Sequence, residues 1–151
     1  VASRQRWQQL VAGLRDGPVR DRLTELGQRV DEGVIAVWET VLGAVEAERI
    51  ASGLDVDRVT DEYKRAKRDP AADPALVEAL SARFQSVQRV LNALDDADGR
   101  LRLLDARLGA AVARGAEVAL AAGTGSEELG AELESVVGEL GALRDSLHSL
   151  G

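Results

Sequence analysis

Cysteine and methionine are both absent from this chain of 151 residues, which holds one histidine, one tyrosine and one phenylalanine. Without cysteine, the chain has no disulfide framework, no thiolate-bound zinc or iron–sulfur cluster and no thiol nucleophile. Aromatic residues make up only 3% of the sequence, so a core must be built from Leu, Val and Ala. Because hydrophobic residues reach 45%, the sequence predicts one folded domain and not a disordered tail.

Net positive charge is also lacking, since 26 acidic residues outnumber 19 basic ones and leave a net charge of -7. This balance argues against a nucleic-acid partner, which requires basic groups that displace counterions from phosphates. No apolar run reaches the roughly 18 residues of a membrane span, and no signal peptide is visible. We therefore expect a soluble, cytoplasmic domain. The chain begins at Val1 and not at a methionine, so we expect it to be a piece of a longer protein.

Apolar residues recur with helical spacing through most of the sequence. From Val19 to Val45 they follow a 4-3-4 pattern that repeats every eleven residues and keeps one helical face apolar. Pro18 suits the first helical position, and Gly53 suits the end of the same helix. The predicted helices span residues 18–52, 55–68, 74–122 and 126–150. They form one bundle over residues 18–151, preceded by a short amphipathic helix within residues 1–17.

The last predicted helix carries the clearest heptad seam. Its apolar residues alternate by four and three: Leu129, Leu133, Val136, Leu140, Leu143, Leu147 and Leu150. Folding this helix back at Gly123 pairs residues whose numbers sum to about 248, such as Leu108 with Leu140. The sequence thus predicts an antiparallel hairpin between the last two helices.

Charged residues predict the same hairpin. Its register brings Arg107 near Glu139 and Arg114 near Glu132, as expected of charges that flank a helix–helix seam. The apolar stripe of residues 74–122 keeps its phase throughout, which indicates one continuous helix about 70 Å long. We therefore predict an all-α fold: an elongated, antiparallel, coiled-coil-like three-helix bundle of long helices with a short extra N-terminal helix.

No constellation of catalytic or metal-binding residues emerges. The segment around Asp98 resembles part of a calcium loop, but Leu94 stands where the first ligand is required and Asp105 where a bidentate Glu is required. His148 has no second metal ligand at helical spacing. No serine triad and no phosphate-binding glycine loop after a strand can be assembled. We therefore predict a non-enzymatic protein with no cofactor, no metal and no small-molecule substrate.

Four residues are candidates for interactions. Arg4, Arg6 and Trp7 form a basic and aromatic pattern that is typical of a helix beside a membrane, although the same pattern suits an ordinary helix packed on the bundle. Trp38 follows Val37 at the edge of the apolar stripe, which suits bundle packing first and a partly exposed anchor for a partner second.

The favoured hypothesis is a helical-bundle interaction or scaffold module, the cytoplasmic part of a bacterial membrane-associated protein. Apolar residues left over after packing would serve self-association as a dimer or bind a partner helix. Two alternatives stay open. One is a ligand-sensing bundle with a pocket near Trp38, Phe84 or Tyr63. The other is a rod that binds membrane surfaces through its N-terminal helix.

Overall fold

The computed structural model describes residues 2–150, and within them the chain is 87% helical, with five helices and no strand. The helices are α1 (Ala2–Ala12), α2 (Pro18–Ser52), α3 (Val56–Arg68), α4 (Pro74–Leu120) and α5 (Ser126–His148). The predicted all-α class is therefore confirmed.

The helix boundaries follow local chemistry. Pro18 and Pro74 each occupy the first position of a long helix, where their missing N–H is not required. The carboxylate of Asp73 caps α4 by accepting a hydrogen bond from the N–H of Ala75 at 3.0 Å. α4 is continuous over 47 residues, as predicted, but it ends at Leu120 and not at residue 122. It ends early because Ala122 turns into the left-handed region at φ 53°.

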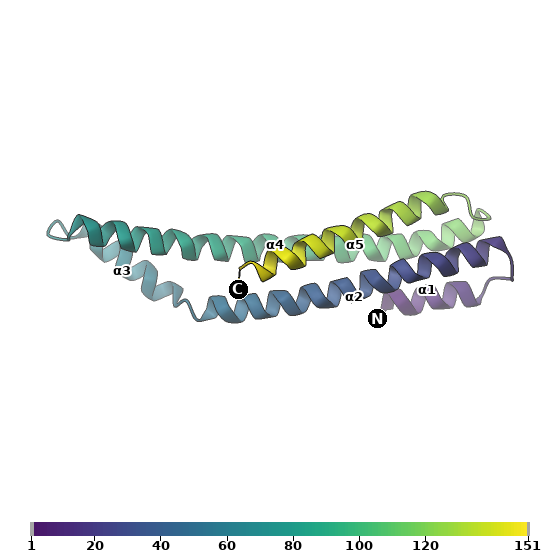
Figure 1. The fold of residues 1–151 in the computed structure, drawn as a ribbon, viewed down its shortest axis with the longest axis horizontal. Coiled ribbons are helices and arrows are strands. Elements are labelled where there is room, and N and C mark those ends of the chain that lie inside the picture. Colours follow the sequence, from purple (N-terminus) through teal and green to yellow (C-terminus); the bar gives the residue numbers. More distant parts are fainter. Residues whose placement is uncertain (1, 151) are drawn as a thin grey trace.

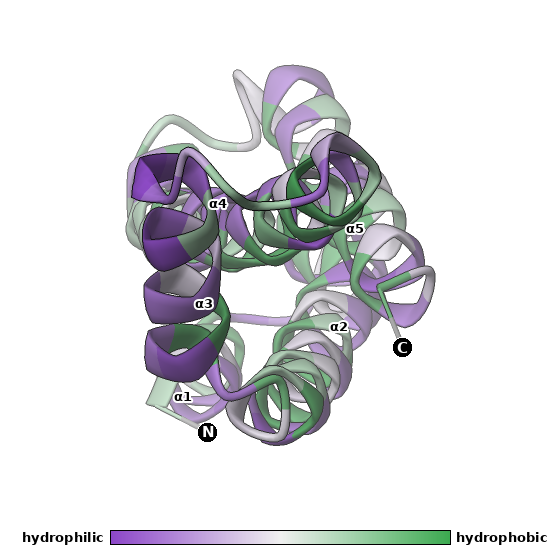
Figure 2. Cartoon of the chain, turned by 90° about the vertical axis from the view of Figure 1, so that its left-hand side faces the viewer, coloured by the Kyte–Doolittle hydropathy of each residue, from purple (hydrophilic) through white to green (hydrophobic). Residues whose placement is uncertain are grey.

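The molecule is long and narrow (Figure 1). α4 runs along almost its whole length, antiparallel to α2 and α5, which both contact it and each other. α5 lies beside α4 only over the half that also holds α1, and α3 continues the path of α2 along the other half of α4. Viewed along the long axis, α3 is hydrophilic over most of its surface (Figure 2).

The core consists of Leu, Val and Ala, as predicted, with a single tryptophan added. The α5 seam is buried from Leu129 to Leu147, and Leu150 is partly buried. Gly33 lets α2 approach α4 closely, because a Cβ at this position would lie 2.9 Å from Cδ1 of Leu108. At the α3 end the packing is thinner: Val59 and Val87 are buried there, and the rings of Tyr63 and Phe84 stack at 5.1 Å.

An ion-pair cluster joins α4 to α5. The guanidinium of Arg107 donates to Glu139, as predicted, and also to Glu132 at 2.9 Å. Hydrogen bonds to these two carboxylates hold the pKa of Arg107 above its ordinary value. The predicted pair between Arg114 and Glu132 is wrong, because Arg107 is long enough to reach both glutamates, which lie two turns apart on α5, while Arg114 is exposed.

Candidate interaction surface on α2

Trp7 holds α1 in the groove between α2 and α4. Its side chain is 3% exposed, and its indole Nε1–H donates to the carbonyl oxygen of Leu23 at 2.9 Å. Two glycines provide the space: a Cβ on Gly27 would lie 2.9 Å from Nε1 of Trp7, and one on Gly115 would lie 2.5 Å from Cζ3. Trp7 is therefore a core residue, which corrects its prediction as an interaction residue.

The two arginines predicted to act with Trp7 are exposed. Arg4 forms an ion pair with Asp31 of α2 at 3.0 Å, and Arg6 lies on the outer face of α1. Burial of Trp7 removes the aromatic residue on which the membrane-proximal interpretation of this segment depended. No helix between residues 2 and 150 is long and apolar enough to cross a membrane.

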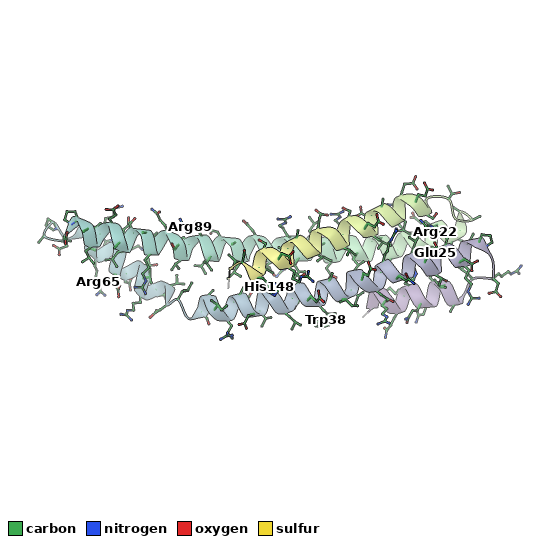
Figure 3. The ribbon with its side chains drawn as sticks, in the orientation of Figure 1. Arg22, Glu25, Trp38, Arg65, Arg89 and His148 are labelled. Atoms are coloured by element: carbon green, nitrogen blue, oxygen red, sulfur yellow. The ribbon has the colours of Figure 1, made fainter. Side chains whose placement is uncertain are left out.

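Trp38, in contrast, lies on the surface, and three more large apolar residues lie beside it. The exposed fractions are 56% for Ile35, 54% for Trp38, 65% for Leu42 and 58% for Val45. Figure 3 places Trp38 on the side of α2 that faces away from α4. These four residues, here called the α2 stripe, follow the 3-4-3 spacing of a heptad seam, so they form one line along the helix. The expectation that Trp38 packs inside the bundle is corrected.

The α2 stripe continues the face of α2 on which α1 packs. Gly27, beneath Trp7, and Asp31, bound to Arg4, precede Ile35 at four-residue steps and therefore lie on nearly the same face. α1 runs antiparallel to α2 and packs on this face as far as Asp31, and the stripe residues on the following three turns are exposed.

Sequence reasoning missed this second face because it assigned Val45 to the core stripe. In the structure the inner face of α2 passes through Thr40 and Ala47, both buried. The Thr40 hydroxyl donates to the carbonyl oxygen of Ala36 at 2.7 Å, so a polar residue occupies a core position. The signal that could have revealed the outer face is the seven-residue step from Ile35 to Leu42, both outside the predicted core stripe.

Opposite charges lie at the two ends of the α2 stripe. Asp31 stands four residues before Ile35, and Arg49 stands four residues after Val45. Arg49 also bonds to Glu46 of the same helix, with Nη2 and Oε1 2.6 Å apart. This hydrogen bond and the charge of Arg49 hold the pKa of Glu46 below its ordinary value, and the same bond and the charge of Glu46 raise the pKa of Arg49.

Several hollows lie along α2, and two of them border the stripe or the charge at its start. One, of about 340 Å³, lies beside α1 and is lined in part by Arg4, Trp7 and Gln28. The other, of about 490 Å³, lies between α2 and α5 and is lined by Glu39, Leu42, Gly43, Glu46, Arg144 and His148. Neither is lined by Trp38, Phe84 or Tyr63, the residues for which a ligand pocket was predicted.

His148 lies at the end of α5 (Figure 3), where its Nδ1–H donates to the carbonyl oxygen of Arg144 at 2.9 Å. Among residues 2–150, no group of three or more histidine and acidic side chains is placed to hold a metal ion. Comparison with protein-family models, with curated proteins and with solved structures gave no match.

Proposed function

We propose that this chain is a non-enzymatic interaction or scaffold module, in which the α2 stripe binds an apolar helix of a protein partner. In this proposal α2, α4 and α5 form a coiled-coil-like three-helix bundle, and α1 is a short extra helix on its flank. The observation that carries the proposal is a line of four large apolar side chains, each more than half exposed, on one helix.

The arrangement of these side chains supports the proposal more than their number does. Single exposed apolar residues are normal on protein surfaces, and Leu76, Leu103 and Leu120 are of this kind. The α2 stripe instead has the spacing by which a second helix inserts its side chains between those of the first. It includes a tryptophan, the residue type most enriched among side chains that dominate binding energy.

The stripe is held on a well-supported helix. Across its inner face α2 buries Val30 and Ala47, and Arg29 forms an ion pair with Glu134 of α5 at 2.7 Å. Arg144 of α5 bonds to Glu39, between the stripe residues Trp38 and Leu42. A surface fixed before binding loses little conformational freedom when the partner arrives, so more of the contact energy remains as affinity.

The setting inferred from the sequence, the cytoplasmic side of a bacterial membrane-associated protein, stays a prediction. The burial of Trp7 weighs against direct attachment through α1.

Site-specific photo-crosslinking tests the proposed function. A photoreactive amino acid replaces Leu42 in one variant and Leu120, which is 90% exposed and outside the stripe, in a matched control. In the cells that naturally produce the chain, we expect protein adducts from position 42 and none from position 120. Equal yields at both positions, or none at position 42, would refute an interaction through the stripe.

A further inference from the structure

We infer that the helix bound by the α2 stripe is the same stripe of a second copy of this chain, packed antiparallel. This inference rests on the proposed function and names the partner in it.

The apolar spacing is self-complementary. Its steps of three, four and three residues read the same in both directions, so two stripes match when one is reversed. Pairing residues whose numbers sum to about 80 places Ile35 opposite the partner's Val45 and Trp38 opposite the partner's Leu42. The two-fold axis then passes near position 40, and each copy contributes the same surface, as a closed dimer requires.

The charges at the two ends of the stripe favour the antiparallel orientation. In the same register Asp31 lies opposite the partner's Arg49, and the symmetry repeats this pair at the other end of the contact. A parallel arrangement would instead set aspartate against aspartate and arginine against arginine, which is unfavourable. Both side chains remain accessible, since Asp31 is 41% exposed and Arg49 is 70% exposed in their pairs within the chain.

In this register the contact ends near the level of α1. α2 ends at Ser52, three residues past Arg49, so only the last turns of the partner's helix reach the level of α1.

Four apolar side chains from each copy and two ion pairs in the whole dimer make a small interface. We therefore expect a reversible dimer with a dissociation constant in the micromolar range, as is typical of contacts below the standard size.

Sedimentation equilibrium of the purified full chain, from low micromolar to millimolar concentration, measures this dimer. Replacing Leu42→Glu puts a charge next to the two-fold axis and is expected to abolish it. Leu120→Glu is the matched control and should leave the dissociation constant unchanged, because Leu120 lies at the far end of α4. Leu42 is mostly exposed, and circular dichroism verifies that both variants fold. An unchanged dimer in Leu42→Glu would overturn the inference.

Charge reversal tests the orientation. Asp31→Arg and Arg49→Asp each create like charges at both ends, so each should weaken its own dimer by about tenfold or more. An equimolar mixture restores opposite charges at both ends, so its heterodimer should match the unmodified chain. In parallel pairing, each single variant would dimerise like the unmodified chain and the mixture would bind more tightly. Arg4→Ala is a further control, because it breaks the pair with Asp31 within the chain and leaves the stripe charges unchanged.

The outcomes separate the two proposals. A chain that stays monomeric at millimolar concentration refutes the second copy as partner. If photo-crosslinking at position 42 then yields an adduct with a different protein, the proposed function holds and the helix bound by the α2 stripe belongs to that protein. If it yields none, both proposals fail.

Discussion

Replacing Gly115→Ala tests whether Trp7 is fixed in the slot between α2 and α4. The added Cβ would lie 2.5 Å from Cζ3 of Trp7 and 3.0 Å from Cδ2 of Leu10. The first distance is too short for two carbon atoms, and the rigid indole cannot bend away from it. We therefore expect the ring, and α1 with it, to be displaced.

The expected magnitude follows from two opposing contributions. Adding a methyl group to a packed core costs about 1–3 kcal/mol. Replacing a helical glycine by alanine gains about 1 kcal/mol, because the unfolded chain loses conformational freedom. Gly109→Ala, on the same helix, should show only the gain in stability of about 1 kcal/mol, since nothing lies within 4 Å of its added Cβ. Gly109→Ala should thus stabilise the protein, and the difference between the two variants, about 1–3 kcal/mol, isolates the clash.

Urea unfolding followed by circular dichroism gives the two free energies. A Trp38→Phe background leaves Trp7 as the only tryptophan, and its fluorescence should shift to longer wavelength when Gly115→Ala exposes the indole. In a Trp7→Ala background the clash with the ring is gone, so Gly115→Ala should then resemble Gly109→Ala. Equal stabilisation by both alanines with Trp7 present would refute the packing described here.

Three further predictions concern charge. The lowered pKa of Glu46 means that the stability it contributes is complete above the ordinary glutamate pKa and is lost as pH falls through the lowered value. An NMR titration should show that pKa rising toward normal in Arg49→Ala, and an unchanged value would contradict the assigned cause. Arg107→Gln should lower the melting temperature at low salt and less so at high salt, because it removes partly exposed ion pairs between α4 and α5. With a net charge of -7 and Trp7 buried, the chain should not sediment with anionic vesicles, and binding that is lost in Arg6→Glu would restore the membrane-surface hypothesis.

The helices could be predicted from the sequence because their signals are local. Pro18 and Pro74 mark two helix starts, and the leucine seam of α5 needs only its own spacing to show which face is buried. The contact between Arg107 and Glu139 could be predicted for the same reason. Each residue has a like charge seven residues away on its own helix, and that spacing is visible in the sequence.

The environments of the two tryptophans could not be predicted in this way. The slot for Trp7 exists because Gly27 and Gly115, from two helices distant in sequence, both lack a side chain. The sequence of α1 alone gives no sign that these two glycines lie next to Trp7. Trp38 is exposed because α2 carries two apolar faces, and the one containing Thr40 is buried. Hydrophobic periodicity identifies such faces, but which one meets α4 and α5 depends on how the three helices come together.

The unequal packing along α4 implies a gradient of local stability. α1, α2 and α5 enclose its C-terminal half, where Leu104, Leu108 and Val112 are buried, whereas α3 covers its N-terminal turns with Val59 and a pair of stacked rings. Segments with fewer buried contacts open at lower free energy. Along α4, amide hydrogens should therefore exchange fastest near Pro74 and progressively more slowly toward Val112, so that the two ends of one continuous helix open at different free energies.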